Sequence, residues 1–395
     1  MTQRLDILSV AHAPFTAINR RPYARLAKLG WSVEMAIPER LPDMSRLADP
    51  AGPHDPPIHW VRTAGHSNNR YWTFEGLLPL LEKLKPRAVI LENEPESRIA
   101  LQVGRWTRTH GAKLLLISNE NDLPPVLPSL LAKRFKPALR TLRARTVTRM
   151  SARGVDHIFA ICQDGVDAME RLGFRGRVSI MPLGFDPAVF HPDAQARTEV
   201  RAALGLTEPT IAYIGRMSPT KGIHILLDAL EQLADLNWRF LIDDFFADPS
   251  AYPQQIKQQI EASPLLSART VRFHADHVEV ARYMNAADIV VVPSVWKEQY
   301  GRVAPEAMAC GKVVVVAQAG ALPELVGETG RVTPMGDVPA LAACLRDLLT
   351  HPQTVEDLGR AAAERARTAL TVDRQIELTD AVLRGLIGGP AAAVP

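Results

Sequence analysis

The sequence has few cysteines and little excess charge of either sign. Its 395 residues include three cysteines, Cys162, Cys310 and Cys344, which stand too far apart for the ligand spacing of a metal site. Their number fits a reducing cytoplasm better than a disulfide-rich secreted protein. The formal net charge of +3 is too small to indicate a nucleic-acid binder by itself.

Long apolar segments are also missing. No apolar run is long enough to cross a bilayer, and residues Met1 to Val10 are typical of a first strand rather than a signal peptide. The loop Ala11 to Phe15 contains no glycine, whereas a nicotinamide or flavin fingerprint would place G-x-G-x-x-G there. We therefore expect a soluble protein, cytoplasmic or at the inner membrane surface, without that kind of cofactor site.

The sequence does contain two successive series of alternating strands and helices. Its length suggests two domains, and a hydrophobic share of 47% can build both cores. The first series begins with a strand at Leu5 to Val10, includes a helix at Trp72 to Lys83, and ends at the proline-containing segment 182–192. This α/β pattern predicts a first domain at 1–188, a second at 189–370, a C-terminal helix at 371–387 and a disordered tail at 388–395.

Two glutamates mark a strand-loop-helix-strand unit in the second series. The apolar run Ile289 to Val292 is typical of a buried parallel strand, and Glu298 and Glu306 follow it with seven residues between them. Open α/β sheets bind ligands at the carboxyl ends of their strands, so both acids are expected at a ligand edge. Each acid alone also fits a simpler role, Glu306 as a first-turn helix acid and Glu298 as a solvated loop residue.

A loop of the same series carries two cations. Gly215 to Gly222 follows a strand and precedes a helix, and Arg216 and Lys221 bracket its proline. Helix N-terminal amides and two cations favour an anion such as a diphosphate, although two exposed cations on a connecting loop are the simpler explanation. Carboxylates beside a diphosphate site would repel the phosphates. Their presence is explained if they accept hydrogen bonds from hydroxyl groups, which a sugar and a ribose both supply.

With these motifs the second half resembles the retaining glycosyltransferases of family 4, which have the GT-B fold. The resemblance rests on Gly215-Arg216 with Lys221-Gly222, the E-x7-E pair, the Gly-x-x-Pro-Glu loop at 320–324, and 183–192, which resembles the family's inter-domain signature. It implies two Rossmann-like domains facing a central cleft, with the last helix crossing back to the first domain. It also implies a metal-independent, retaining transfer of a hexose-type sugar from a nucleotide-diphosphate sugar.

The resemblance assigns roles to the matching residues. Arg216 and Lys221 would neutralise the donor diphosphate, Glu306 would hold the nucleotide ribose, and Glu298 the transferred sugar. The other implied substrate-binding residues are Gly215, Tyr300, Gly301, Arg302, Val303 and Glu324. No metal and no cofactor are implied, since the nucleotide sugar is a substrate.

The first half departs from the family pattern. Relatives carry a glycine-rich first loop and a histidine near the end of the fourth strand, whereas this chain has Ala11 to Phe15 and Ser118 to Asn121 there. Asn119 or Glu120 is therefore a candidate for the place beside the reacting sugar. His12 is a third candidate, with a purely structural hydrogen bond as its alternative role.

A basic segment lies between residues 123 and 155, which contain no acid. Its cations are Lys133, Arg134, Lys136, Arg140, Arg143, Arg145, Arg149 and Arg153. Apolar residues between them favour a helix at 130–153 that lies on an anionic membrane surface or faces an anionic acceptor, while a solvated helix packed on the first sheet fits equally. The expected partners are a nucleotide-sugar donor and a glycan, lipid-linked or small-molecule acceptor, with no nucleic acid.

Two other functions remain open at this point. A GT-B sugar-nucleotide epimerase would share the two-domain layout but make a free sugar, and a non-catalytic module would only bind the nucleotide sugar. Asp243 and Asp244 stand where the family has a G-x-G turn. They leave the contacts to the base and phosphates open.

Overall fold

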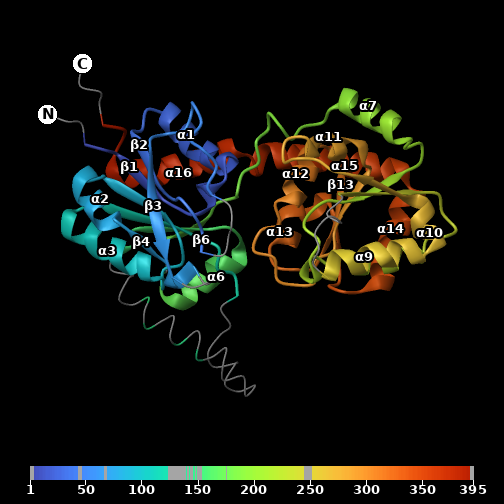
Figure 1. Ribbon diagram of the computed structural model, residues 1–395, viewed down its shortest axis with the longest axis horizontal. Coiled ribbons are helices and arrows are strands. Elements are labelled where there is room, and N and C mark those ends of the chain that lie inside the picture. Colours follow the sequence, from blue (N-terminus) through green and yellow to red (C-terminus); the bar gives the residue numbers. More distant parts are fainter. Residues whose placement is uncertain are drawn as a thin grey trace. The chain divides into compact units, whose positions relative to one another are not determined.

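The chain forms two compact units, each with one sheet between layers of helices (Figure 1). The computed structural model describes residues 4–42, 47–65, 69–122, 154–174, 176–243 and 251–391, together with 139, 142, 146 and 148. Contacts assign Met1–Pro182 and Asp373–Pro395 to the first unit and Leu183–Val372 to the second. The basic positions between Lys133 and Arg153 lie outside the described residues.

The first unit contains an eight-stranded sheet in the order β4-β3-β2-β1-β5-β6-β7-β8. Neighbouring strands are parallel except β3 and β4, which are antiparallel. The strands are β1 (Ile7–Val10), β2 (Val33–Pro38), β3 (Ile58–Ala64), β4 (Thr73–Glu75), β5 (Ala88–Glu92), β6 (Lys113–Ser118), β7 (His157–Ala160) and β8 (Val178–Ile180). Because β1, β5 and β6 are adjacent and parallel, the loops that follow them leave the sheet at one edge.

Helices cover both faces of this sheet. They are α1 (Arg21–Lys28), α2 (Leu77–Leu84), α3 (Arg98–His110), α6 (Gln163–Leu172) and α16 (Val372–Ile387). Successive strand residues point to opposite faces. Ile7 and Ile90 belong to the core beneath α1 and α16, whereas Leu8 and Val89 belong to the core beneath α2, α3 and α6. Figure 1 shows the red α16 among the blue elements of this unit, so residues from both ends of the sequence build one core.

The second unit contains a parallel six-stranded sheet in the order β11-β10-β9-β12-β13-β14. Its strands are β9 (Thr210–Tyr213), β10 (Arg239–Asp243), β11 (Thr270–Phe273), β12 (Ile289–Val292), β13 (Val313–Ala317) and β14 (Arg331–Thr333). Its helices are α7 (Ala194–Leu204), α8 (Ile223–Glu231), α9 (Ala251–Ala262), α10 (Pro264–Arg269), α11 (Val280–Ala286), α12 (Val303–Ala309), α13 (Leu322–Val326), α14 (Val338–Thr350) and α15 (Pro352–Ala369). The four valines of β13 are fully buried, as expected of a strand covered on both faces.

The helix predicted at Trp72 to Lys83 is wrong in its first half. Residues 73–75 form β4, which pairs with β3, and α2 begins only at Leu77. Gly76 separates the two elements at φ +79°, a conformation that a continuing helix does not allow. Thr73 and Phe74 are residue types that suit a strand.

The units divide the chain at slightly different places from those expected at 188 and 370. The segment from Leu183 belongs to the second unit because Phe185 bridges to the residues before α16. The Phe185 amide donates to the Leu370 carbonyl at 3.2 Å, and the Val372 amide donates to the Phe185 carbonyl at 2.9 Å. Gly184 makes this approach possible, since a Cβ there would lie 2.3 Å from the Val372 backbone.

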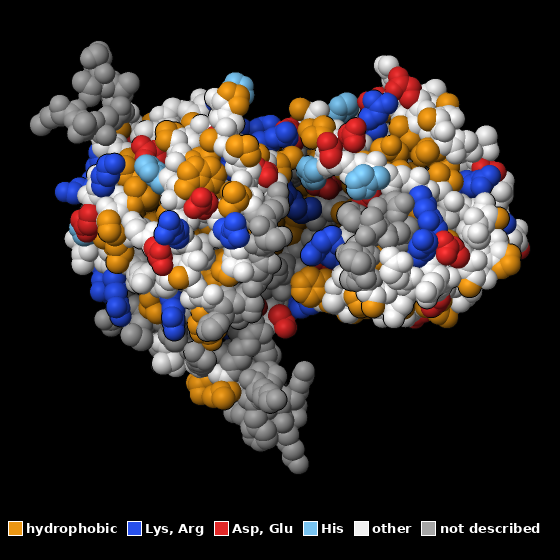
Figure 2. Space-filling view, viewed as in Figure 1, with side chains coloured by type: hydrophobic (Ala, Val, Ile, Leu, Met, Phe, Trp, Pro, Cys, Tyr) orange, Lys and Arg blue, Asp and Glu red, His pale blue; other side chains and the backbone are white. Residues whose placement is uncertain are grey.

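Part of the expected disordered tail is ordered in the structure. Arg87 Nη1 donates to the Gly389 carbonyl at 3.0 Å, and the Ala391 amide donates to Asp6 at 3.2 Å. These contacts hold residues 388–391 against the first unit. None of the described helices has the length and hydrophobicity needed to span a bilayer. On the face of the first unit visible in Figure 2, the described Lys and Arg side chains are interspersed with Asp and Glu.

Candidate functional site

Two loops meet at the carboxyl edge of the second sheet. β9 and β12 are parallel neighbours, so the loops after Tyr213 and Val292 leave the sheet side by side. The Val295 amide donates to the Thr220 carbonyl at 2.9 Å and joins the two loops. Gly222, at φ +69°, allows the contact, because a Cβ there would lie 1.9 Å from a backbone carbonyl oxygen.

An ion pair crosses from one loop to the other. Lys221 Nζ lies 2.6 Å from Glu298 Oε1, which also accepts from Ser294 Oγ at 2.5 Å. The Glu298 side chain is 4% exposed and that of Lys221 is 22% exposed, so the ammonium is the solvent-facing member of the pair. The exposed Trp296 ring lies 5.7 Å from the same ammonium, within cation–π range.

The backbone of Glu298 is fixed by the Gly320 to Glu324 loop. The Ala321 amide donates to the Glu298 carbonyl at 3.1 Å. Gly320 has φ +59°, and a Cβ there would lie 2.1 Å from the same carbonyl oxygen. The loop therefore acts here through its backbone. The Glu324 side chain is exposed, and its carbonyl accepts from Arg365 at 2.8 Å.

Glu306 is buried in the first turn of α12. Burial raises the pKa of its carboxyl to about 7, although the nearby Arg302 guanidinium works in the opposite direction. Gly301 precedes α12 at φ +85° and packs against Leu322, where a Cβ would lie 2.5 Å from the side chain. Tyr300 is buried, which raises the pKa of its hydroxyl, while Gly301, Arg302 and Val303 are half-buried.

Arg216 is an exposed cation beside this pair of loops. Its carbonyl accepts from the Tyr213 hydroxyl at 2.9 Å, which fixes the backbone while the guanidinium reaches solvent. Gly215 supplies the turn at φ +139°. The structure thus brings Lys221, Glu298 and the 320–324 loop into contact, and it places Arg216 on the first of the two loops.

The corresponding edge of the first sheet is acidic. Glu94 follows β5 and is buried, and it accepts from Ser118 Oγ and from the Asn119 amide, the latter at 3.0 Å. Glu120 is also buried, and its Oε1 accepts from the Asp122 amide at 2.9 Å. The predicted residues Asn119 and Glu120 therefore lie beside an acid that the sequence did not single out.

One arginine links the acids of this edge. Arg70 Nε lies 2.8 Å from Glu96 Oε1, and Arg70 Nη2 pairs with Glu120. Burial raises the pKa of Glu94 to about 8, and the neighbouring Glu96 and Glu120 add to the shift. Glu94 therefore holds its proton near neutral pH, which reduces the charge that Arg70 must balance.

His12 lies at the same edge, after β1. Its ring packs edge-on against Trp72 with centroids 5.7 Å apart. The next residue donates its amide to Glu92 Oε2 at 3.1 Å, which ties the first loop to the end of β5. His12 is half-buried.

Among the described residues, no group of three or more His, Cys, Asp or Glu side chains could hold a metal ion. Asp243 ends β10 and is buried, while Asp244 lies outside the described residues.

Several contributors were not predicted from the sequence. They are Ser294, Trp296, Glu94 and Arg70. The first three follow strands of the α/β pattern, so a search of every strand end for polar or aromatic residues would have included them. Arg70 had no such signal, because it lies in the short 3-10 helix Asn69–Tyr71, far from β5 and β6 in sequence.

Family models match both halves of the chain. Residues 18–184 match the glycosyl transferase 4-like domain, and residues 208–351 match the glycosyl transferases of group 1. The two matches correspond to the two sheets.

Relatives with assigned activities match part of the chain. A Corynebacterium efficiens protein named D-inositol 3-phosphate glycosyltransferase is 36% identical over 202 residues, which are 48% of this chain and 47% of that protein. A Mycobacterium tuberculosis protein named GDP-mannose-dependent alpha-(1-6)-phosphatidylinositol dimannoside mannosyltransferase is 26% identical over 280 residues, 69% of this chain and 68% of its own. The chain spans about half the length of the inositol phosphate relatives that it matches.

Solved structures resemble the whole chain. Sucrose-phosphate synthase from Thermosynechococcus elongatus has a TM-score of 0.73 and 23% identity, covering 97% of this chain and 99% of its own. Anabaena HepE in complex with UDP-glucose has a TM-score of 0.70 and 20% identity, covering 97% and 100%. These likenesses confirm the predicted GT-B fold.

Proposed function

Because the chain belongs to the group 1 glycosyl transferases, we propose that it moves a hexose-type sugar from a nucleoside diphosphate sugar to an acceptor hydroxyl. The observation that carries this proposal is the Lys221–Glu298 pair at the carboxyl edge of the second sheet, with Arg216 on the same loop as Lys221. This edge combines cations for a diphosphate with a carboxylate for sugar hydroxyls. Relatives that use GDP-mannose or were solved with UDP-glucose support the donor class.

The chemistry follows from charge. As the bond between sugar and diphosphate breaks, negative charge grows on the leaving oxygens, and Lys221 and Arg216 stabilise it. Glu298 accepts hydrogen bonds from the sugar, and Glu306 holds the ribose. Buried Glu306 is half-protonated near pH 7, so it can donate as well as accept a hydrogen bond to a diol.

Donor binding competes for the Lys221 ammonium. In the described structure Lys221 pairs with Glu298, and its side chain is partly exposed and flexible enough to turn toward a phosphate. Glu298 then keeps its Ser294 hydrogen bond and gains the sugar hydroxyl in place of the ammonium. The Lys221 ammonium thus exchanges the Glu298 carboxylate for a phosphate, and hydrogen bonds from hydroxyl groups offset part of the cost to the buried carboxylate.

Retention of the anomeric configuration and independence of metal are further parts of the proposal. The acceptor hydroxyl attacks from the face that the diphosphate leaves, and positioning of the acceptor supplies the remaining catalysis. The acids and amides around Glu94 and Glu120, with His12 nearby, are the candidate acceptor-side groups. A glycan, lipid-linked or small-molecule acceptor suits an edge made to bond hydroxyls, and the membrane role of 130–153 belongs to the same proposal.

The test measures donor use by the purified chain. Thermal-shift screening with UDP- and GDP-hexoses identifies a donor, since a ligand that binds only the folded form raises the melting temperature. Transfer is then assayed with a panel of glycan and inositol acceptors. Lys221→Ala should lower turnover by roughly a hundred-fold or more. It should also lower the melting temperature in the absence of donor, because the buried Glu298 loses its ammonium partner. Arg360→Ala, which removes an exposed cation from α15 of the same unit, is the matched control.

Three results would oppose the proposal. Parental turnover in Lys221→Ala would remove the role of that residue. Release of free sugar with no effect of any acceptor would favour the epimerase, and donor binding without turnover would favour a binding module.

A further inference from the structure

A cavity of about 400 Å³ lies at the opposite end of the second sheet from the candidate site. Ile289 begins β12 and lines the cavity, whereas Glu298 follows the other end of that strand. Lys312 lines it just before β13, and the end of α14 and the start of α15 complete the wall. The cavity therefore lies within one unit and shares no lining residue with the proposed donor site.

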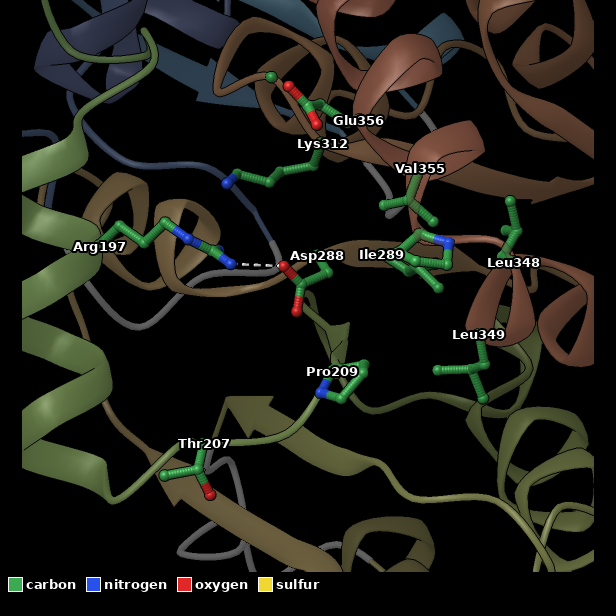
Figure 3. A pocket seen from close by; sticks show the side chains of 12 residues that line it. Arg197, Thr207, Pro209, Asp288, Ile289, Lys312, Leu348, Leu349, Val355 and Glu356 are labelled. Carbon is green, nitrogen blue, oxygen red and sulfur yellow. Dashed lines mark hydrogen bonds and ion pairs between the residues drawn. The ribbon is translucent and has the colours of Figure 1, made fainter.

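Two cations lie on one side of this cavity. Figure 3 shows the Lys312 ammonium and the Arg197 guanidinium on that side, with a dashed line from Arg197 to Asp288. Arg197 is satisfied, because Nη2 lies 2.6 Å from Asp288 and Nη1 donates to the carbonyls of residues 285, 286 and 287. It holds the C-terminal end of α11 and serves a structural role.

Lys312 is different. It is 8% exposed, and its only hydrogen bond among the described residues is from Nζ to the Asn285 carbonyl, a neutral acceptor, at 2.8 Å. No carboxylate pairs with it there. Burial and the neighbouring Arg197 lower the pKa of its ammonium to about 8, although the Asp288 carboxylate works in the opposite direction. A buried cation without a direct ion pair is costly, and a bound anion would offset that cost.

The other side of the cavity is apolar. Leu348 and Leu349 from α14, Val355 from α15 and Ile289 from β12 line it in Figure 3. The exposed acid Glu356 also lines the cavity. Pockets of this size that combine an apolar wall with a few placed polar groups are typical of small-molecule sites.

We propose that this cavity binds a small amphipathic anion, with its carboxylate or phosphate at Lys312 and its apolar body against Leu348, Leu349 and Val355. The volume accommodates a short acyl chain or a single ring. The site is independent of the proposed sugar transfer, because it uses none of the same residues. An experiment that disproves anion binding in the cavity therefore leaves the proposed sugar transfer untouched, and the reverse also holds.

The experiment titrates the full chain by calorimetry with four probes. Octanoate and octyl phosphate carry both an anionic group and an eight-carbon chain. Octanol has the chain without the charge, and acetate has the charge without the chain. We expect either amphipathic anion to bind roughly ten-fold or more tightly than octanol, and acetate not to bind. The two anions also distinguish a carboxylate ligand from a phosphate ligand.

Three variants locate the binding. Lys312→Met keeps the length of the side chain and should reduce the affinity of the anions to that of octanol. Val355→Trp fills the cavity from a half-buried position and should abolish binding of every probe. Lys83→Met, an exposed lysine of the first unit, should change nothing.

Two results would overturn the inference. One is no heat of binding for either anion at roughly millimolar concentration. The other is anion binding that Val355→Trp leaves intact, which would place the probe elsewhere even if Lys312→Met failed to fold.

Discussion

The two sheets present the same kind of edge with opposite charge. At the second sheet, the exposed Arg216 and the half-buried Lys221 accompany two buried acids, Glu298 and Glu306. At the first sheet, three acids surround one arginine. Parallel strands and loops supply the scaffold in both cases, so the fold does not decide what each edge binds.

The edges also differ in how they are held. The second relies on close backbone approach, with Gly222 against one carbonyl and Gly320 against the carbonyl of Glu298. The first relies on side chains, with Ser118 donating to Glu94 and Arg70 reaching two acids. A diphosphate suits the cationic, backbone-fixed edge, whereas hydroxyl groups suit the acidic one. An anionic acceptor group would be repelled near Glu120.

The largest expected difference comes from removing one arginine at each edge. Arg216→Ala should lower turnover by roughly a hundred-fold and leave the melting temperature unchanged, because the guanidinium is exposed. Arg70→Ala should lower the free energy of unfolding by about 2 kcal/mol, because it leaves partly buried acids unpaired. Transfer assays and urea denaturation measure the two effects. If both variants lost the same free energy of unfolding, the two arginines would not differ in role as proposed.

A second test addresses the backbone contact. Gly320→Ala should lower the free energy of unfolding by about 3 kcal/mol, since its Cβ would meet the Glu298 carbonyl at 2.1 Å. Gly336→Ala has a similar φ of +75° with open space around the Cβ, so about 1 kcal/mol is expected there. Urea denaturation midpoints give both values. Identical losses would show that φ alone, and not the contact, is responsible.

A third test uses pH, because each edge contains one buried glutamate whose pKa is raised. Glu94 has its pKa raised to about 8 and Glu306 to about 7, from an ordinary value near 4.5. Between the ordinary pKa and the raised pKa of each carboxyl, the folded state binds more protons than the unfolded state. Stability therefore falls as pH rises through that range. Glu94→Gln should remove its share of the decline in melting temperature between pH 5 and about 8, and Glu306→Gln its share between pH 5 and about 7.

The wild-type profile is the control for that test. If either glutamine variant retained the full decline in melting temperature, the corresponding carboxyl would be ionised in the folded protein.

The smallest expected effect concerns two aromatic rings. Trp296→Leu removes the ring 5.7 Å from Lys221 Nζ and should change donor affinity about three-fold, the size of an exposed cation–π contact. Tyr71→Leu removes a similar contact, 5.8 Å from Arg98 in the first unit, and should leave donor affinity unchanged. Titration with the donor measures both. If both variants changed donor affinity equally, the Trp296 ring would act through the stability of the fold and not through its contact with Lys221.

Much of this arrangement is predictable from residue patterns. Buried parallel strands are short, continuous and apolar, so β1, β5, β12 and β13 stand out in the sequence. The donor-side loops follow directly from them, because Gly215 to Gly222 and Glu298 adjoin strand ends. The apolar pattern failed for residues 73–75, where an edge strand of three residues is too short to show a period.

The features that the sequence did not predict depend on contacts between residues far apart in the chain. Arg70 and Glu120 are fifty residues apart in sequence and meet only through the sheet order. The cavity at Lys312 depends on how α14 and α15 cover the strand starts, which local patterns do not encode. Glu94 lies shortly after the apolar run of β5 in the sequence, but its raised pKa depends on burial that only the fold supplies.

Helix α16 has a consequence for the order of events during synthesis. Ile376 and Leu383 complete a core of the first unit, and Trp31 Nε1 donates to Asp380 at 2.7 Å. These residues leave the ribosome after the whole second unit. The first half of the polypeptide therefore waits with a sheet face that α1 covers without α16 while the second half folds, so chaperone demand should fall on the part made first.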